Sequence, residues 1–284
     1  MLPGHQIICV SSIDWDFNWQ GHQEIMATFA RQGNRVLFVE NTGVRPPRLS
    51  DLGRLRRRVA KWRTGVRGFR QVQDNLWVLS PLILPFPYGR LSRWANRWLL
   101  LRAIRRWMRA VDCRDPILWT FLPTGTAVDV LQGIGHKLAV YYCIADFETL
   151  VAAQAKVRRT EAEVLRRCDL VFAQGEGLAQ RCRRWNANVH IFPFGVSLDR
   201  ISPSGNGGLP EDLRGVPRPI IGYIGGLHRH VDFELLGALA RRRNWSLVLV
   251  GPLQEGAARV PKADNVFALG EKPFAQLADY VSQF

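Results

Sequence analysis

The sequence predicts an α/β protein made of two parallel-sheet units of the doubly wound kind. Apolar runs of strand length alternate with helical patterns over the first 195 residues. A stretch rich in Pro, Gly, Ser and Asn follows, and a second strand–helix–strand series begins after it. Strands that are apolar almost from end to end and are separated by helices are typical of a parallel sheet covered on both faces.

The first unit, residues 1–197, is expected to alternate short buried strands with longer helices. The strands are the apolar runs at 6–10, 35–40, 76–79, 117–121, 138–142, 170–173 and 189–192. The helical patterns lie at 20–32, 91–110, 151–167 and 177–185. Gly33 and Asn34 end the first of these helices, since both residue types favour the turn that follows a helix.

Residues 198–218 have the composition of an interdomain linker, and residues 219–284 begin a second unit. Strands are expected at 220–224, 247–250 and 266–269, with a helix at 231–242 and another from about 273 that is still running at Phe284. Roughly 65 to 80 residues after the linker are fewer than a domain of this class needs to cover both sheet faces. We therefore expect the second domain to be incomplete.

Positive charge is concentrated in one part of the chain. The formal net charge is +15, and the window from Arg45 to Arg109 holds 17 basic residues against Asp51 and Asp74, so the remainder is neutral overall. Aromatic residues, including several tryptophans, are interleaved with these charges. Such a block fits an anionic lipid surface, where indoles settle at the headgroups, or nucleic acid. A solvated basic helix face with tryptophans in the core is the third interpretation.

The remaining composition points to a globular cytoplasmic protein. The five cysteines are scattered and mostly flanked by apolar residues, which favours reduced core thiols over a disulfide framework or a zinc site. No apolar run approaches the roughly 20 residues needed to cross a bilayer. The start of the chain has neither a basic leader nor a cleavage site. No hydrolase, metal-site or P-loop motif is present, so no metal ligands are expected.

Candidate ligand-binding residues follow the predicted strands, because ligands of open parallel sheets bind at the carboxyl ends of the strands. The long loop after the first strand leads into the first helix and is dense in polar and aromatic side chains. Its candidates are Asp14, Trp19, Gln20 and His22. The same residues also have a purely structural interpretation, in which His22 begins a helix and the tryptophans fill the core.

Later strands are followed by further polar residues, and these are Glu40, Thr124, Asp146 and Glu176. Residues in such places converge on one crevice, although each is also typical of a helix cap or a first-turn acid. Asp146 is the strongest catalytic candidate among them. In the second unit, Gly225 and Gly226 form a turn between a buried strand and a helix, where backbone amides can approach a diphosphate. A dinucleotide fingerprint is absent, since no third glycine stands in register.

In this light the chain resembles family 4 of the retaining glycosyltransferases, which have the GT-B fold of two Rossmann-like domains. More narrowly, it is similar to bacterial enzymes of cell-surface polysaccharide assembly, including teichuronic-acid-type transferases. The matching segments follow in order along the chain and lie at 11–22, 39–43, 84–87, 119–123, 141–147, 192–196 and 223–226.

The resemblance implies an amino-terminal domain that binds the acceptor and a carboxyl-terminal domain that binds a UDP- or GDP-sugar, with no metal and no other cofactor. It implies roles for the candidates as follows: catalysis by Asp146 and His22, acceptor binding by Asp14, Trp19, Gln20, Glu40, Thr124 and Glu176, and donor binding by Gly225, Gly226, His228, Arg229 and His230. The two-glutamate donor motif of the family would lie after Phe284. These 284 residues alone are therefore expected to have little or no transferase activity.

The function predicted is transfer of a sugar from a nucleotide-sugar donor to a lipid-linked or polysaccharide acceptor. The enzyme is expected to work at the inner face of the cytoplasmic membrane, as a peripheral protein resting on anionic lipid and not on nucleic acid. Two alternatives stay open at this point. One is a nucleotide-sugar epimerase of the same fold, and the other is a basic nucleic-acid-binding protein, whose binding would weaken steeply with salt.

Overall fold

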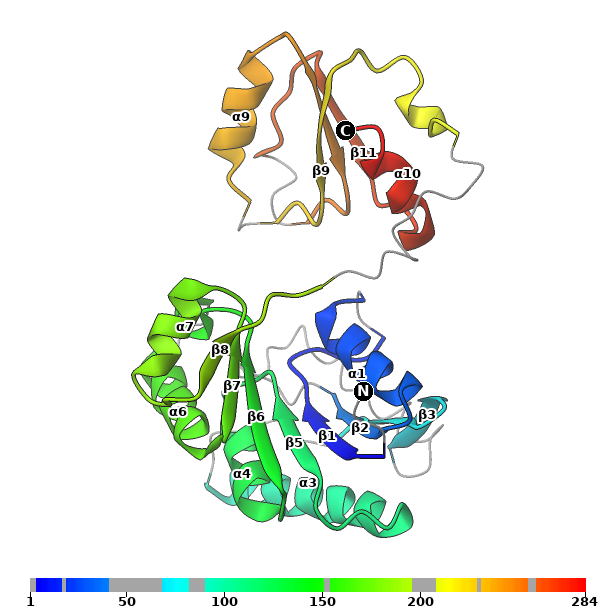
Figure 1. Cartoon of the computed structure of the whole chain (residues 1–284). Coiled ribbons are helices and arrows are strands. Elements are labelled where there is room, and N and C mark those ends of the chain that lie inside the picture. The colour runs from blue at the N-terminus through cyan, green and yellow to red at the C-terminus, as the bar shows by residue number, and fades with distance from the viewer. Residues whose placement is uncertain are drawn as a thin grey trace. The chain divides into compact units, whose positions relative to one another are not determined.

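The computed structural model describes residues 4–16, 19–40, 68–81, 90–150, 154–195, 208–228, 231–254 and 259–284. The chain divides into two compact units, Met1–Phe194 and Gly195–Phe284 (Figure 1). Each unit has its own sheet and its own buried core.

An eight-stranded sheet forms the centre of the first unit. Its strands are β1 (Gln6–Val10), β2 (Arg35–Val39), β3 (Phe69–Gln73), β4 (Leu76–Leu79), β5 (Ile117–Thr120), β6 (Leu138–Cys143), β7 (Leu170–Ala173) and β8 (Val189–Ile191). They lie in the order β3-β4-β2-β1-β5-β6-β7-β8, and every neighbouring pair is parallel except β3 with β4. In register, Ile8 faces Leu37 on one side and Leu118 on the other.

The seven predicted strands are confirmed to within one residue at each end, and β3 was missed. Its sequence, FRQVQ, is half polar, because it is an edge strand whose side chains are only partly buried. A tight turn joins it to β4, and Asn75 in that turn has a left-handed φ of 61°. Asn adopts that conformation more easily than most residues.

The helices of this unit are α1 (Gly21–Arg31), α3 (Arg90–Ala110), α4 (Gly125–Gly133), α5 (Phe147–Leu150), α6 (Gln154–Arg167) and α7 (Glu176–Arg183). The four predicted helices are present, and α4 and α5 were missed. The helix expected at 151–167 is observed from Gln154, and residues 151–153 lie outside the described part of the chain. α4 is short and is bounded by glycines, which weakens its helical pattern.

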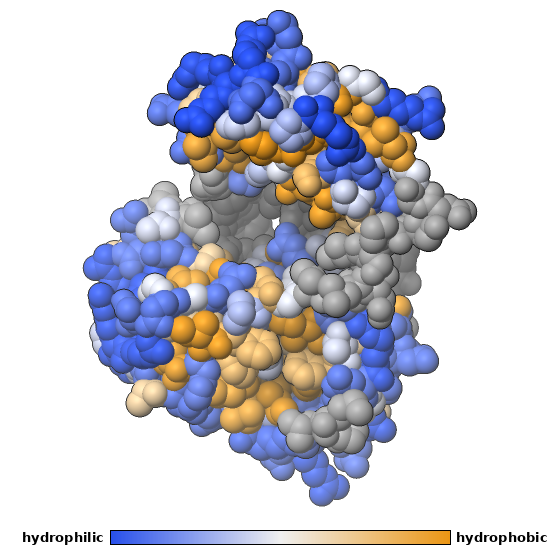
Figure 2. All heavy atoms as spheres, turned by 45° about the horizontal axis from the view of Figure 1, so that its top comes forward, coloured by the Kyte–Doolittle hydropathy of each residue, from blue (hydrophilic) through white to orange (hydrophobic). Residues whose placement is uncertain are grey.

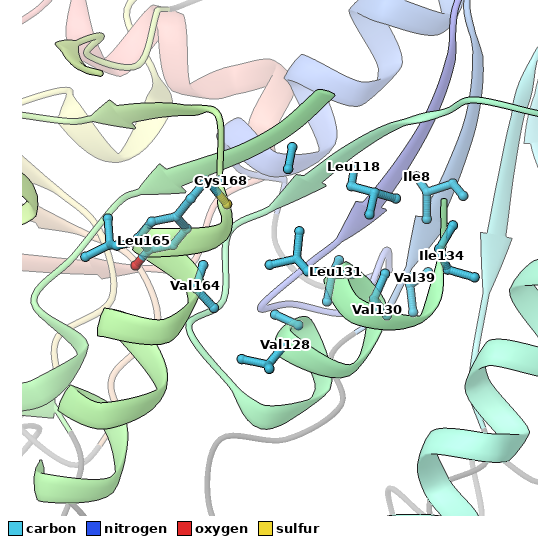
Figure 3. Close-up of a cluster of buried hydrophobic side chains, with 14 of the residues drawn as sticks. Ile8, Val39, Leu118, Val128, Val130, Leu131, Ile134, Val164, Leu165 and Cys168 are labelled. Atoms are coloured by element: carbon cyan, nitrogen blue, oxygen red, sulfur yellow. The ribbon is translucent and has the colours of Figure 1, made fainter. Parts of the chain in front are cut away.

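One face of the sheet is thickly covered. Helices α3, α4, α6 and α7 all pack on it, and their buried side chains form a single core with the strands. Figure 3 shows part of this core, in which Ile8, Val39 and Leu118 from the strands meet Leu131 and Val164 from α4 and α6. All five cysteines are free and buried, which confirms the prediction of core thiols.

The opposite face is covered less densely, although a helix packs there too, as expected. Among the described residues only α1 packs there, over β1, β2 and β4. Over β5 to β8 the face carries an aromatic ladder in which Phe172 lies 5.1 Å from Phe192 and 5.8 Å from Trp119, measured between ring centroids. Phe192 is 53% exposed, and apolar side chains gather on this side of the unit (Figure 2).

The second unit has a parallel sheet of β9 (Ile220–Ile224), β10 (Ser246–Val250) and β11 (Val266–Gly270) in the order β11-β10-β9. The helix α9 (Phe233–Arg241) covers one face. The other face holds α10 (Leu277–Val281) and the 3-10 turns η2 (Glu211–Leu213) and η4 (Phe274–Gln276) (Figure 1).

The second unit has two features that the sequence pattern did not predict. The stretch predicted as linker, 198–218, includes η2, and Leu213 in that turn is buried in the core. The last helix ends at Val281 instead of continuing to Phe284, after beginning as a 3-10 turn behind Pro273. Proline fixes its own φ and is common at the start of a helix. The sequence pattern therefore predicts one continuous helix from Pro273, where the structure has a 3-10 turn followed by a short helix.

Candidate functional site

The topology places the candidate site at the carboxyl end of β1. The chain leaves β1 toward β2 on one side and later returns to β5 on the other, so the strand order reverses at this strand. A crevice at such a switch point is where open α/β sheets bind ligands. The loop after β1 and the start of α1 stand at this position, with Phe121 directly after β5.

His22, on the first turn of α1, is one of the buried residues among the predicted site residues. It is 2% exposed, and its ring centroid lies 4.2 Å from that of Phe121. Its Nε2 is 2.9 Å from Ser12 Oγ, whereas Nδ1 has no hydrogen-bond partner among the described residues. Burial lowers the pKa of His22 from 6.5 to about 4, because the charged ring loses hydration. The imidazole is therefore neutral at physiological pH and able to exchange a hydrogen bond with a hydroxyl.

The α1 start also brings Trp19 and Gln20 to the surface. Trp19 is 36% exposed, and its Nε1 donates a 2.7 Å hydrogen bond to Glu24 Oε2. Gln20 is the exposed N-cap of α1, and its backbone amide donates to Gln23 Oε1 at 2.9 Å. Asp14 is half-buried in the same loop. Four predicted residues thus lie on one loop and one helix turn.

Glu40 occupies a different environment from the other acceptor-side candidates. It follows β2 and is fully buried, and both carboxylate oxygens are engaged. Oε1 accepts from the Trp15 backbone amide at 3.1 Å, and Oε2 accepts from Ser80 Oγ at 2.6 Å. Its observed contacts therefore hold the loop in place.

Asp146 belongs to a second polar group, at the carboxyl end of β6. It forms an ion pair with Arg181 of α7, and Arg181 Nη2 also lies 2.9 Å from Glu161 Oε1 of α6. The Tyr141 hydroxyl donates to the same Glu161 oxygen at 2.9 Å. Glu161 is buried, and burial raises its pKa against the opposing effect of Arg181. No hydrogen bond or ion pair of the described residues joins this group to His22.

Arg181 and Glu161 were missed by sequence reasoning, although one signal was present. Glu161 stands among Val157, Val164 and Leu165 on the apolar side of α6, where an acid needs a buried partner. The other two predicted residues are simpler. Thr124 is the N-cap of α4, with its side chain accepting from the Ala127 amide, and Glu176 is an exposed first-turn acid of α7.

In the second unit, Gly225 and Gly226 follow β9 as predicted. Close backbone packing there requires glycine at Gly251, after β10, because a Cβ on Gly251 would stand 2.0 Å from the Gly225 carbonyl oxygen. His228 donates from its backbone amide to the Gly226 carbonyl at 3.1 Å. Arg229 and His230 lie outside the described residues.

A cavity of about 610 Å³ in the second unit was not predicted. It is lined by a polar triad, in which Lys272 Nζ lies 2.6 Å from Asp212 and the Tyr280 hydroxyl donates to Asp212 at 2.8 Å. Lys272 follows β11, so its position after a strand was visible in the sequence. Asp212 was hidden because it falls in the stretch predicted as linker.

Comparison with known proteins yields matches of structure only. No protein-family model and no curated sequence matches the chain. A sucrose-phosphate synthase from Thermosynechococcus elongatus matches with a TM-score of 0.67 at 17% identity, over 98% of this chain and 74% of that one. The catalytic domain of starch synthase IV from Arabidopsis thaliana matches with a TM-score of 0.56 at 11% identity, over 98% and 76%.

A glycosyltransferase from Rickettsia africae also matches, with a TM-score of 0.56 at 12% identity, over 98% of this chain and 71% of that one. At such identities a likeness establishes fold and leaves function to the site. The chain therefore has the two-domain α/β architecture of these transferases, the GT-B fold that its sequence predicts.

Proposed function

We propose that the protein is a glycosyltransferase that transfers a sugar from a UDP- or GDP-sugar to a lipid-linked or polysaccharide acceptor in cell-surface polysaccharide assembly. The observation that carries this proposal is a polar loop with a buried neutral histidine, held at the switch point of a fold shared with sugar transferases. One solved structure that is similar to this chain, with a TM-score of 0.52, is an E. coli protein described as bound with UDP-2-fluoroglucose. The starch synthase structure is described as bound to ADP and acarbose.

On the acceptor side, the proposed roles follow from position. His22 offers a neutral ring nitrogen to a sugar hydroxyl, and Asp14, Trp19 and Gln20 supply hydrogen bonds and a stacking surface beside it. Trp19 suits this role because a sugar ring packs its C–H face on an exposed indole. Glu40 acts through the loop that it holds, and Thr124 and Glu176 extend the acceptor contacts from α4 and α7.

Asp146 is proposed as an electrostatic participant. Its carboxylate, held by the ion pair with Arg181, is proposed to stabilise positive charge on a sugar. Gly225, Gly226, His228, Arg229 and His230 are proposed to meet the donor diphosphate. The reaction is proposed to proceed with retention and without a metal, as in family 4.

The direct test is a donor and acceptor screen with the full-length protein. UDP-glucose, UDP-N-acetylglucosamine and GDP-mannose are each incubated with farnesyl-diphosphate-linked N-acetylglucosamine, and released nucleotide and extended acceptor are measured by chromatography. We expect acceptor extension with one donor and a strong loss in the His22→Ala variant. An epimerised donor with no extended acceptor would instead support the epimerase alternative, and no change in any donor would refute enzymatic use of this class of substrate.

We also propose that the protein works against the anionic inner face of the membrane. Helix α3 carries seven arginines and no acid over its 21 residues. The three tryptophans of α3 differ in exposure. Trp107 is 4% exposed and belongs to the core, whereas Trp94 and Trp98 are 68% and 50% exposed. Indoles one turn apart beside arginines suit the headgroup region of a bilayer, where both groups are stabilised. None of the described helices is long and apolar enough to span a membrane.

Vesicle flotation tests the membrane proposal. Vesicles of equal parts phosphatidylglycerol and phosphatidylcholine should carry the protein upward, and vesicles of phosphatidylcholine alone should not. Replacing Trp94 and Trp98 by alanine should weaken binding about tenfold, as expected when two interfacial indoles are lost. Trp185→Ala is the matched control, since Trp185 is 41% exposed and stacks on Arg166 away from α3. Equal binding by both variants, or preference for RNA or DNA at matched salt, would refute it.

A further inference from the structure

The loop between β1 and α1 is fastened at two separate places. At its base, Ser12 and His22 meet through the 2.9 Å contact between Oγ and Nε2. At its far end, Trp15 and Asp16 reach across the ends of the neighbouring strands. The base lies at the switch point and includes His22, which is proposed to contact the acceptor. The far end bears on the site through the loop backbone and through the Trp15 ring, whose centroid lies 5.5 Å from that of Trp19.

The attachment at the far end depends on a buried carboxylate. Glu40 is fully buried and accepts from the Trp15 amide at 3.1 Å, which fixes the backbone of the loop. The Trp15 ring packs edge-on against Phe38 of β2, with ring centroids 5.0 Å apart. A buried carboxylate is stable only when a cation or several donors compensate its lost hydration.

Arg70 supplies that cation from the edge strand β3. Its Nη2 lies 3.3 Å from Glu40 Oε1 and 2.9 Å from Asp16 Oδ2, so one guanidinium bridges the buried acid and the exposed loop acid. The Arg70 side chain is 31% exposed, and the Asp16 side chain 48%. The edge strand is thereby tied to a loop that leaves the sheet three strands away.

We infer that Arg70 is a positioning residue that sets the conformation of the acceptor-binding loop through Asp16 and Glu40. This inference rests on the proposed function, since the loop is assigned to the acceptor there. Arg70 itself contacts neither His22 nor Ser12. Its effect comes from preorganisation, because a binding loop that is already held in place loses less entropy when the ligand binds.

The test uses Asp16→Asn, which weakens the bridge and leaves the Glu40–Arg70 pair to preserve folding. The control is Glu163→Gln, which weakens an exposed ion pair with Arg167 on α6. Arg70→Lys is the second variant, keeping the charge and removing the planar fork. Hydrogen–deuterium exchange of the loop amides and transferase kinetics are measured on each full-length protein.

We expect exchange at residues 13–16 to rise about tenfold in Asp16→Asn and Arg70→Lys, since one charge-assisted hydrogen bond is lost, and to stay unchanged in the control. KM for farnesyl-diphosphate-linked N-acetylglucosamine should rise about fivefold while KM for the sugar nucleotide stays constant. Unchanged exchange, or faster exchange with both KM values unchanged, would overturn the inference alone. If the wild-type protein transfers no sugar although its loop amides are protected from exchange, the proposed function is refuted as well.

Discussion

The buried histidine predicts a measurable dependence of stability on pH. Above pH 6.5 the imidazole of His22 is neutral in both the folded and the unfolded chain, so its titration has no effect on folding. As the pH falls below 6.5, the unfolded chain binds a proton that the folded chain does not bind until about pH 4. Each pH unit in this window removes about 1.4 kcal/mol from the free energy of unfolding, and the whole window removes about 3 kcal/mol.

The variant His22→Gln isolates this contribution, because glutamine cannot titrate and still offers a hydrogen bond to Ser12. Urea unfolding is followed by tryptophan fluorescence at a series of pH values from 7.5 to 4.5. Nine of the ten tryptophans lie in residues 1–194, so the signal reports mainly the first unit. Wild type should lose about 2 to 3 kcal/mol more than the variant over this range. Parallel curves would show that the ring is hydrated in the folded protein and would refute the argument from burial.

Three further predictions probe other parts of the structure. Gly251→Ala should destabilise the second unit by at least about 2 kcal/mol, seen as early loss of the Trp245 signal on heating, because its Cβ would meet the Gly225 carbonyl; an unchanged melting temperature would contradict this. Arg181→Met should cost about 3 to 5 kcal/mol in urea unfolding, and adding Glu161→Gln should recover part of it; no recovery would show that Glu161 is not left unpaired. Asp232→Ala should cost about 1 kcal/mol and Asp232→Ser much less, because serine also caps α9, and equal losses would exclude a capping role.

Most strands could be predicted because buried parallel strands must be apolar along their whole length. The strand β1, QIICV, is an example, with four of its five residues buried. The strand β3 escaped prediction for the opposite reason: as an antiparallel edge strand it needs apolar side chains only in part, and Gln71 and Gln73 are accommodated there. A sequence pattern reports burial, so it fails where a strand forms without much burial.

The position of the site was predictable, and its internal pairing was not. Topology alone places the residues after β1, β2 and β6 at one edge of the sheet. The pairing of Asp146 with Arg181 joins residues 35 positions apart, and that of Asp16 with Arg70 joins residues 54 apart. Such partners are selected by tertiary packing, and no spacing rule in a single sequence records them. Glu40 is an example: its position after a strand predicts a ligand-binding residue, but in the structure its buried hydrogen bonds hold a loop.

The turn after β9 shows how the structure sharpens an expectation based on glycine. Backbone amides there were expected to approach a diphosphate, yet Gly225, Leu227 and His228 already donate to carbonyls of the same unit. The carboxylate of Asp232 occupies the amino terminus of α9, where it accepts from the Glu234 and Leu235 amides. A helix end capped by an acid attracts an anion less than an open one, because the cap offsets the helix dipole. Under the proposed function, donor binding at this turn therefore depends on cationic side chains more than on backbone amides.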